Sequence, residues 1–496
     1  MFRGRTVGLL VALSIMLSSL VTLLVIDSAP RHLASTQANV SIKEKHQAQN
    51  SPGVSVEVEE KFTKIKEAFE IIRHNYVFEV DEERLLEGAI EGMLKTLEDP
   101  YSVYMNPEVA EQFKSSLQSS FEGIGAEVTM QNGRVTIVAP IRGSPAEKAG
   151  LRPNDQILSV NGEDLEGLDL QQAVMKIRGP KGSKATLVIK RPELAEPITI
   201  TVVRGEIPLE TVYAELLEVD GKKIGKIELT SFAQRTAERF AKELKRLESL
   251  GMQGLIIDVR GNPGGYLDAV EEIGKLLVPN ESIITEIQNR EGNKLIYRST
   301  LKEKKPYPIT ILIDDGSASA SEILASALQE AGGYTVIGVP SFGKGTVQST
   351  VQMNDQSEIK IAIAKWLTPK GNWIHEKGVQ PDIHVEQPDF FRAAPIQTEP
   401  PLREDMNSEA VANLQLILRA LGYDPGRDDG FFSEQTKQAV IRFQQDHQLR
   451  PTGVVDEKTA SLLQDKVIEL IRDPQHDRQL QKAIEHIVKE INKLKP

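Results

Sequence analysis

Three serines alternate with small residues in the stretch "IDDGSASASEILASALQEAGG", which runs from Ile313 to Gly333. A buried-type strand precedes them and a helix with one apolar face follows. Helix N-termini favour serine as the capping residue, and Ser321 is the serine we expect to cap this helix. A serine just before the cap would lie beside backbone N–H groups that stabilise an oxyanion. Taken alone, the stretch favours the plainer interpretation that all three serines pack or cap.

A lysine between two glycines follows in "SFGKGTVQS". Lys344 and Gln348 would share a face both in a strand, through their even spacing, and in a helix, as residues i and i+4. Most lysines are solvated, but burial in a glycine-flanked apolar segment favours the neutral amine. A neutral amine accepts a proton from a serine hydroxyl. The two stretches together therefore predict serine–lysine catalysis, which needs no histidine.

The second element is the strand, turn and helix "LIIDVRGNPGGYLDAVEEIGKLL". Its double glycine, Gly264 and Gly265, stands at a helix start, where N–H groups are available to an anion. Phosphate is the competing ligand, but the GxxxxGKS pattern of phosphate loops is missing from this stretch. We interpret the loop as an oxyanion hole or a substrate-binding edge, with a ligand-free tight turn as the alternative.

Length and composition bound these hypotheses. The chain has 496 residues, of which 40% are hydrophobic and 26% charged, so we expect three or four globular units. With 59 basic and 71 acidic residues the net charge is −12, which argues against nucleic acid as a partner. The sequence has no cysteine, which excludes disulfides, thiolate catalysis and cysteine zinc sites. The eight histidines form no HExxH-type pair, and we expect no metal or other cofactor.

The N-terminus predicts export. Arg3 and Arg5 precede an uncharged run from Thr6 to Ile26, which is 21 residues long and close to the ~20 that cross a bilayer. Positive charge before such a run keeps the N-terminus cytoplasmic and sends the rest outside. We favour an uncleaved anchor within residues 1–30, with a cleaved signal peptide as the alternative. Both interpretations place the remaining chain outside the cytoplasm.

The rest of the chain changes character several times. Composition, hydrophobic periodicity and punctuation by glycine and proline define the segments. We expect a flexible linker at 31–56, a helical region that packs or dimerises at 57–115, a β-rich module at 116–205, an α/β core at 206–392, a proline-rich linker at 393–404, a compact helical segment at 405–465 and a C-terminal helix at 466–496.

Three stretches together, "DVRGNPGG", "GSASASEILASALQ" and "FGKGTVQ", resemble the carboxyl-terminal processing proteases, over about residues 60–390. The stretches "GMLKTLEDPYS" and "GNWIHEKGVQPDI" also look like motifs of that family. The resemblance implies an α/β core of the crotonase/ClpP type. It further implies a nucleophile at Ser319, a general base at Lys344, an orienting residue at Gln348, and oxyanion donors from the backbone of Ala320, Gly264 and Gly265.

The β-rich module resembles a PDZ domain. In "FEGIGAEV", Gly123, Ile124, Gly125 and Ala126 take the place of the carboxylate-binding loop, beside which a peptide C-terminus adds as a strand. Ala126 stands where the usual GLGF form has phenylalanine, so the preferred final residue of the peptide stays open. Arg178 in "KIRGPKG" is similar to an arginine that links PDZ position to active-site alignment, and an ordinary surface ion pair is the alternative.

Residues of about 405–465 resemble a peptidoglycan-binding domain of type 1, through "VANLQLILRALGYDPGRDDGFF" and the helix after it. The resemblance implies a three-helix bundle whose loop "YDPGRDDGFF" contacts the sugar-peptide ligand. The residues that we expect in its core are Leu414, Leu418, Leu421, Val440, Phe443 and Leu462.

The sequence therefore predicts an exported serine endopeptidase that binds C-terminal tails of protein substrates through its PDZ domain. The partners we expect are those substrates, peptidoglycan, the membrane through the N-terminal segment, and a second copy of the chain. Resemblance to proteases of spore-forming bacteria implies proteolytic signalling across the spore or cell envelope. A non-catalytic envelope scaffold is the alternative, whereas export and the PDZ domain exclude a crotonase-like acyl-CoA enzyme.

Overall fold

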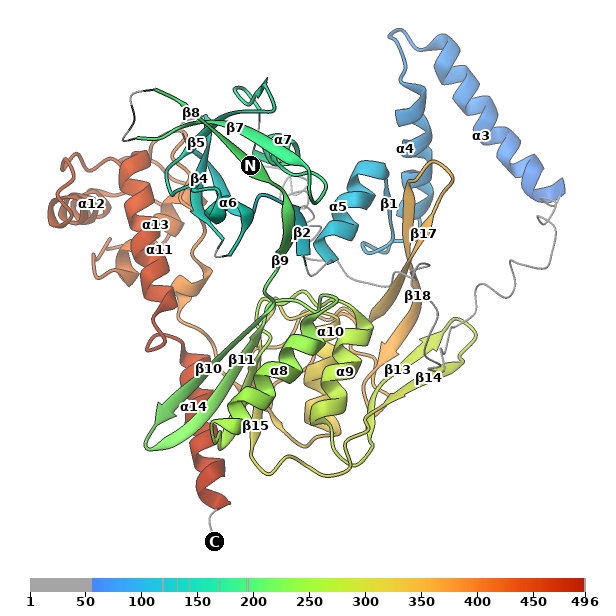
Figure 1. Ribbon diagram of the computed structural model, residues 1–496, viewed down its shortest axis with the longest axis vertical. Helices are drawn as coiled ribbons and strands as arrows, with labels where there is room; N and C mark the ends of the chain where they lie inside the picture. Colours follow the sequence, from blue (N-terminus) through green and yellow to red (C-terminus); the bar gives the residue numbers. More distant parts are fainter. Residues whose placement is uncertain are drawn as a thin grey trace. The chain divides into compact units, whose positions relative to one another are not determined.

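The computed structural model describes residues 56–117, 120–131, 133–141, 143–168, 170–192, 194 and 196–494. The predicted anchor and all but the last residue of the predicted linker lie outside the described residues. None of the helices among the described residues is long and apolar enough to cross a membrane. The described residues form two compact units: residues 56–117 join Asn289–Asn293 and Thr346–Lys365 in the first, and the other described residues form the second. Figure 1 shows the elements of both.

The first unit combines N-terminal helices with a hairpin from much later in the chain. A short strand, β1, pairs antiparallel with β18, which in turn pairs antiparallel with β17. Asp81 caps α4, because its side chain accepts a hydrogen bond from the Arg84 N–H. The elements are α3 (Val56–Asn75), α4 (Glu82–Lys95), β1 (Val103–Met105), α5 (Pro107–Leu117), β17 (Thr346–Gln352) and β18 (Glu358–Leu367).

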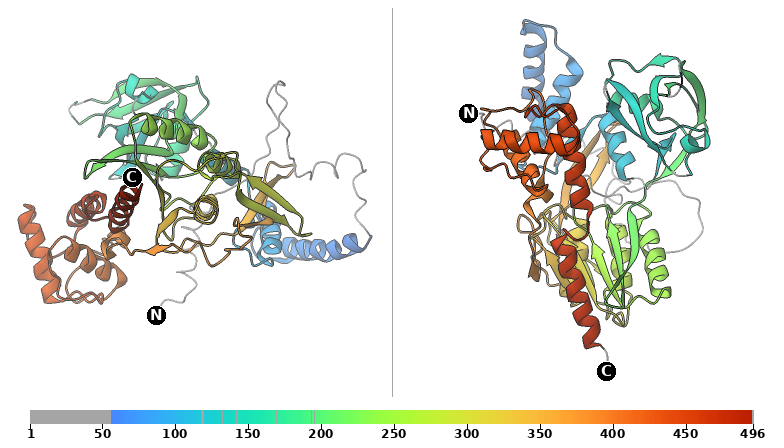
Figure 2. Two further views of the ribbon diagram at one scale, coloured as in Figure 1. Left: turned by 90° about the horizontal axis from the view of Figure 1, so that it is seen from below. Right: turned by 90° about the vertical axis from the view of Figure 1, so that its left-hand side faces the viewer.

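The second unit contains the α/β core that the sequence predicts. Its six-stranded sheet has the order β10–β11–β12–β15–β16–β19, and all neighbours except β10 and β11 run parallel. Helices α8, α9 and α10 cover one face and α14 covers the other (Figures 1 and 2). The core elements are β10 (Val212–Val219), β11 (Lys222–Leu229), α8 (Thr236–Ser249), β12 (Gly254–Asp258), α9 (Leu267–Leu277), β13 (Ile283–Asn289), β14 (Lys294–Arg298), β15 (Ile309–Ile313), α10 (Ala320–Glu330), β16 (Thr335–Gly338) and β19 (Ile383–His384).

The β-rich module packs two short helices on its strands, around a core of buried aliphatic residues such as Ile137, Leu187 and Ile189. Strand β2 pairs with β9, while β3, β4, β5, β7 and β8 form a separate sheet with β6 at its side. The elements are β2 (Ser120–Gly123), β3 (Ala126–Gln131), β4 (Arg134–Pro140), α6 (Pro145–Lys148), β5 (Gln156–Val160), β6 (Glu163–Asp164), α7 (Leu170–Ile177), β7 (Lys184–Lys190), β8 (Ile198–Val203) and β9 (Gly205–Pro208).

The C-terminal part forms the expected three-helix bundle from α11 (Glu409–Ala420), α12 (Glu434–Asp446) and α13 (Glu457–Arg472), after a short 3-10 helix at Asp389–Arg392. All six predicted core residues are confirmed, because four are fully buried and Leu421 and Leu462 pack against them. The expectation of a single helix over 466–496 is wrong. Helix α13 ends before Pro474, since the residue preceding a proline avoids the helical region, and α14 (Arg478–Lys493) follows.

Helix α14 returns to the protease core. Its residues Leu480, Ala483, Ile487 and Ile491 are buried against β-sheet side chains that include Ile256. The apolar face of α14 therefore packs within the chain itself. That face is already covered by the chain's own sheet.

Candidate active site

The two strand–turn–helix stretches meet at one edge of the core sheet. Strands β12 and β15 are parallel neighbours, with Asp258 paired with Leu312. The carboxyl ends of adjacent parallel strands lie together, so the turns after them also lie together. The turn after β12 holds Gly264 and leads into α9, whereas the turn after β15 holds the three serines and leads into α10.

The outer two serines tie these turns to each other. The Ser317 hydroxyl donates to the Val259 carbonyl at 2.8 Å, and the Ser321 hydroxyl donates to the Asn262 carbonyl at 2.9 Å. The prediction that Ser321 caps the helix is wrong. Helix α10 begins at Ala320, and its N-cap position is Ser319. Ser321 lies in the first turn of α10, and its hydroxyl bonds to the neighbouring turn instead of capping the helix.

The middle serine has an unusual backbone. Ser319 has φ 53° and ψ −111°, a positive φ that non-glycine residues rarely adopt. Such strain persists where surrounding contacts hold it, and it clusters at functional sites. The residue is 7% exposed, so its hydroxyl lies in a largely enclosed position at the start of α10.

Gly264 lies directly against this serine. A Cβ at Gly264 would stand 2.8 Å from the Ala318 carbonyl oxygen and 3.0 Å from both the Ala320 nitrogen and the Ser319 Cβ. At Gly265 a Cβ would stand 2.1 Å from the Phe232 carbonyl oxygen. Both glycines are therefore needed for close backbone approach, and Gly264 in particular lets the loop pack on the backbone around Ser319.

The backbone N–H groups that are predicted to bind the oxyanion, those of Gly264 and Ala320, lie in different surroundings. The Gly264 N–H donates to the Asn262 side-chain oxygen at 2.8 Å, so in this structure that donor already has a partner. The role of Gly264 as an oxyanion donor therefore stays a prediction, and it requires this hydrogen bond to Asn262 to open. Ala320 is the first residue of α10, where backbone N–H groups and the helix dipole favour negative charge.

A buried carboxylate links the serine to the lysine. Glu322 is 0% exposed, and its carboxylate accepts hydrogen bonds from the backbone N–H of both Ser319 and Lys344, each at 2.8 Å. The same carboxylate accepts from the Gly343 N–H at 2.7 Å and the Ser341 hydroxyl at 2.5 Å. Burial raises the pKa of the Glu322 carboxyl, and the hydrogen bonds oppose that rise. One side chain thus fixes the backbone of both predicted catalytic residues.

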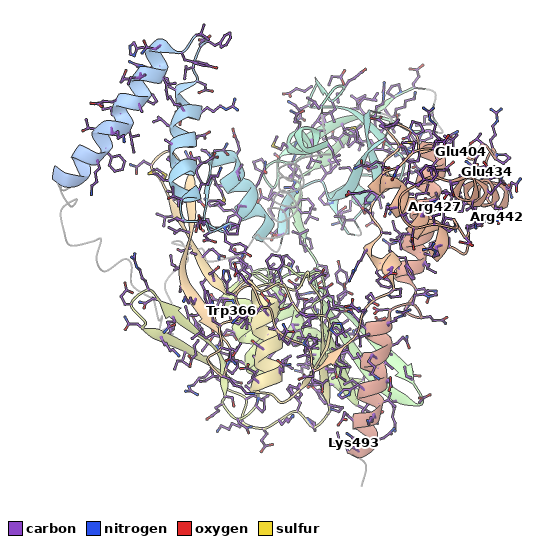
Figure 3. The ribbon with its side chains drawn as sticks, turned by 180° about the vertical axis from the view of Figure 1, so that it is seen from behind. Trp366, Glu404, Arg427, Glu434, Arg442 and Lys493 are labelled. Carbon is purple, nitrogen blue, oxygen red and sulfur yellow. The ribbon has the colours of Figure 1, made fainter. Side chains whose placement is uncertain are left out.

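The expectation that Lys344 is buried is confirmed, because the residue is 1% exposed. Its carbonyl accepts a hydrogen bond of 2.7 Å from the indole nitrogen of Trp366, a fully buried side chain that Figure 3 labels. The flanking glycines provide room, as expected. A Cβ at Gly343 would stand 2.9 Å from the Lys377 nitrogen, and one at Gly345 would stand 2.7 Å from the Trp373 indole nitrogen.

Gln348 belongs to the first unit and lies on β17 with 1% exposure. Its side-chain amide donates to the Thr346 hydroxyl at 2.7 Å, so these two side chains share a face, as their even spacing predicts. Lys344 precedes the strand, which begins at Thr346. Both interpretations of the spacing, which placed Lys344 and Gln348 on one strand or on one helix, are therefore wrong.

The predicted peptide-binding loop connects β2 and β3. The Ile124 carbonyl accepts from Ala146 N–H at 2.7 Å, and the Gly125 carbonyl accepts from Ile141 N–H at 2.9 Å. Gly125 has φ 78°, and a Cβ there would stand 2.5 Å from Ser144. Ala126 begins β3 and pairs with Pro140.

Arg178 lies beside the strand that leads into this loop. Its guanidinium carbon is 4.9 Å from the centre of the Phe121 ring, and its Cγ lies near Gly123. A cation–π contact of this kind positions a long side chain against the strand. The arginine predicted from the resemblance therefore lies next to the predicted carboxylate-binding loop.

Sequence reasoning missed Glu322 and Asn262. A signal for Glu322 was present, because serine followed three residues later by glutamate is the capping-box pattern. The bond from the Ser319 N–H to Glu322 is the backbone half of such a box. The role of Asn262 as an acceptor for Gly264 had no signal in the sequence, because it depends on a turn conformation.

Comparison with known proteins matches four segments of the chain to protein families. Residues 223–385 match peptidase family S41, and residues 136–191 match the PDZ domain. Residues 21–109 match the N-terminal domain of the activating protease CtpB, and residues 407–463 match a putative peptidoglycan binding domain.

The chain is 53% identical over 424 residues to the carboxy-terminal processing protease CtpB of Bacillus subtilis, with 86% of this chain and 88% of the relative covered. It is 37% identical to the carboxy-terminal processing protease CtpA of the same organism, with 87% and 91% covered. Among solved structures, a photosystem II D1 C-terminal processing protease is 26% identical, covers 66% of this chain and 86% of its own, and has a TM-score of 0.41.

Proposed function

The chain belongs to the carboxy-terminal processing proteases, which are serine peptidases of family S41, and we propose that Ser319 is its nucleophile and Lys344 its general base. The observation that carries this proposal is the Glu322 carboxylate, which accepts hydrogen bonds from the backbone of both residues. Burial of Lys344 adds support, because a buried amine favours its neutral form and then accepts a proton.

The proposed reaction is acyl transfer. The Lys344 amine takes the proton of the Ser319 hydroxyl as the serine oxygen attacks the scissile carbonyl carbon. The resulting oxyanion forms at the N-terminus of α10, where the Ala320 N–H and the helix dipole stabilise it. Collapse breaks the C–N bond, and the lysine ammonium returns its proton to the leaving amine. Water then attacks the acyl-enzyme, and the Lys344 amine again acts as the general base. This step releases the second product and restores the Ser319 hydroxyl.

In this proposal Gln348 orients the Lys344 amine toward the serine hydroxyl. The support is its burial on β17, where the hydrogen bonds to Thr346 fix the amide, and its place four residues after the lysine in the chain. An amide offers an acceptor oxygen to an ammonium and to a neutral amine alike, so it does not force either charge state.

The PDZ domain is proposed to bind the C-terminal tail of the substrate as an added strand beside the loop from Gly123 to Ala126. The peptidoglycan-binding domain suggests an extracytoplasmic location. The finer role, proteolytic signalling at the cell or spore envelope by a membrane-anchored enzyme, belongs to the proposal. Its support is the N-terminal run of 21 uncharged residues together with the wall-binding bundle.

A homodimer through the N-terminal helices is part of the same proposal. Helix α3 carries apolar side chains that stay exposed within this chain, among them Phe62 at 52% and Ile65 at 44%. They recur at helical spacing, and a second copy of α3 would cover them. Light scattering of the chain with Phe62 and Ile65 changed to serine is expected to report the monomer mass.

Cleavage of an unfolded protein with a free C-terminal tail tests the catalytic assignment. The unaltered chain is expected to turn this substrate over, while Ser319→Ala and Lys344→Ala are each expected to lose turnover. The non-catalytic scaffold predicts tail and peptidoglycan binding without turnover by any of the three. Unchanged turnover in either variant would contradict the assigned roles.

A further inference from the structure

One sequence motif has no part in the proposed chemistry, the "DPYS" turn from Asp99 to Ser102 in the first unit. The Ser102 N–H donates to the Asp99 carbonyl at 3.3 Å, which closes a β-turn with proline in its favoured second position. The Asp99 carboxylate accepts from the Tyr101 N–H at 3.0 Å and from the Ser102 hydroxyl at 2.6 Å. These bonds fix both the backbone and the hydroxyl of Ser102, which is 6% exposed.

The Ser102 hydroxyl makes one contact outside the turn. It accepts a hydrogen bond of 3.0 Å from the Ala362 N–H on β18. Ala362 lies two residues past Lys360, which is the last β18 residue that β1 pairs. Ser102 directly precedes β1, so its hydroxyl adds one hydrogen bond to β18 beyond the residues that β1 pairs. With its own proton donated to Asp99, its oxygen is available as an acceptor for this N–H.

Ala362 is the direct cross-strand partner of Gln348. The β17–β18 ladder pairs Val347 with Ala364 and Gln348 with Ala362, so Ile363 is an extra residue on β18. An extra residue in one strand is a β-bulge, which locally disrupts the ladder and re-aims neighbouring side chains. Gln348 thus lies where its own ladder is irregular, and the backbone opposite it is held by Ser102.

We propose that the Asp99–Ser102 turn is a positioning element for Gln348. The turn fixes Ala362 from the outer side of β18, and the fixed bulge sets the direction in which the Gln348 side chain leaves β17. The N-terminal region then contributes to catalysis itself, in addition to any contact with a second subunit. This inference rests on the proposed role of Gln348 in orienting Lys344.

The test uses the full-length chain and steady-state cleavage of an unfolded protein with a free C-terminal tail. Ser102→Ala removes the acceptor for Ala362 and is expected to lower kcat about tenfold with KM unchanged. Gln348→Ala is expected to lower kcat further, by about a hundredfold. The double variant is expected to be no slower than Gln348→Ala, because a positioning residue has nothing left to position.

Ser357→Ala is the matched control. Ser357 is also fully buried on the same hairpin, and its hydroxyl donates to Asp355 at the hairpin turn, away from the bulge. Its kcat is expected to stay within twofold of the unaltered chain. If Ser102→Ala does not fold, Asp99→Asn is the second variant, since it weakens the hold on the Ser102 hydroxyl while keeping the shape of the side chain.

The outcomes separate the two proposals. A Gln348→Ala variant with unaltered kcat overturns the role of Gln348 in the proposed function. A slow Gln348→Ala with a further, multiplicative loss in the double variant leaves that role intact and overturns the positioning inference alone. A Ser102→Ala that matches the Ser357→Ala control in kcat also overturns it. A tenfold loss that disappears in the Gln348→Ala background supports it.

Discussion

The turns after β12 and β15 are neighbours, and each connects a strand to a helix. They differ in their side chains. The first, from Val259 to Tyr266, contains three glycines and a proline. Its glycines leave room for the backbone of neighbouring segments. The second, from Asp314 to Ser321 at the start of α10, contains three serines and two aspartates, and its side chains supply hydroxyl groups. Bonds cross between them in both directions: Gly261 N–H donates to Asp314 at 2.7 Å, and Ala318 N–H donates to the Asn262 carbonyl at 3.0 Å.

The difference shows how work is divided within the site. The glycine turn carries little side-chain chemistry, but its lack of Cβ atoms allows it to pack on the strained backbone of Ser319. The serine turn carries the proposed nucleophile, and its outer serines bind it to the glycine turn. The third segment, with Lys344, is held through the Glu322 carboxylate. The serine turn therefore has a chemical task in the proposed mechanism, and the glycine turn has a steric task.

The largest effect is expected from the middle serine. Ser319→Ala removes the nucleophile and should lower kcat by about 10⁴-fold or more. Ser321→Ala, in the same turn, removes only the bond to the Asn262 carbonyl and should lower kcat less than about tenfold. Steady-state cleavage measures both. Similar losses in the two variants would show that the serine turn acts as a packing unit and that Ser319 has no special task.

Glu322→Gln should have the next largest effect. The amide presents a donor group to a site where four donors converge, so at least one N–H loses its acceptor. We expect kcat to fall about 10²- to 10³-fold, because both Ser319 and Lys344 move. Glu330→Gln, at the half-exposed C-terminal end of the same helix, is the control and should retain its activity. A fast Glu322→Gln enzyme would contradict the proposed tie between serine and lysine.

Gly264→Ala tests the steric task. The residue has φ 107°, and the added Cβ would stand 2.8 Å from the Ala318 carbonyl oxygen, so the backbone around Ser319 must shift. A kcat loss of about 10- to 100-fold is expected. Gly261→Ala, with φ 63° and open space around its Cβ, shares the backbone strain without the contact, and it should lose stability with little loss of kcat. Equal kcat in the two variants would argue against close approach as the reason for glycine.

The protonation of Glu322 should appear in the pH dependence of both activity and stability. Burial raises its pKa above the ordinary 4.5, and only the ionised carboxylate accepts all four bonds. Activity should therefore fall as the pH decreases through this raised pKa. The folded state holds the proton more tightly than the unfolded chain, so the stability contribution of this group is complete below pH 4.5 and declines as the pH rises through the folded pKa.

Activity and this part of the stability thus change in opposite directions with pH. Unfolding by urea across pH 4 to 8, compared between the unaltered chain and Glu322→Gln, measures the difference in unfolding free energy. As the pH rises, the unfolding free energy of the unaltered chain is expected to fall relative to that of Glu322→Gln. A shift in its favour would mean that the carboxyl pKa is lowered on folding.

The smallest effect is expected at the outer end of the glycine turn. Arg260 pairs with Asp258 at 2.7 Å and with Asp477 at 2.8 Å, so the C-terminal helix α14 is attached to this turn and the serine turn has no such link in the described residues. Asp477→Asn should lower the melting temperature by a few degrees and kcat less than about threefold. Asp473→Asn, in the same connecting segment but half-exposed and hydrogen-bonded to the nearby Gln475 N–H, should change neither. A large kcat loss at unchanged melting temperature would give α14 a catalytic task.

The sequence was sufficient for the fold class, because strand–turn–helix punctuation and helical periodicity are local signals. The roles of the three proposed catalytic residues stay predictions. Ser319, Lys344 and Gln348 followed from motif resemblance, and the burial of Lys344 followed from its glycine flanks. The hydrogen-bond partners of the side chains around the site could not be predicted from the sequence. Ser321 was assigned to a cap, whereas its hydroxyl binds a carbonyl 59 residues earlier in the chain. Glu322 and Asn262 act on residues that only the tertiary fold brings near.

The most direct test of the account is covalent labelling of the full-length chain with a fluorophosphonate, followed by identification of the modified peptide by mass spectrometry. The account predicts a single label on Ser319, which is formed at least 100-fold more slowly when Lys344 is changed to methionine. A label on Ser317 or Ser321, or an unchanged labelling rate without the lysine amine, would contradict it.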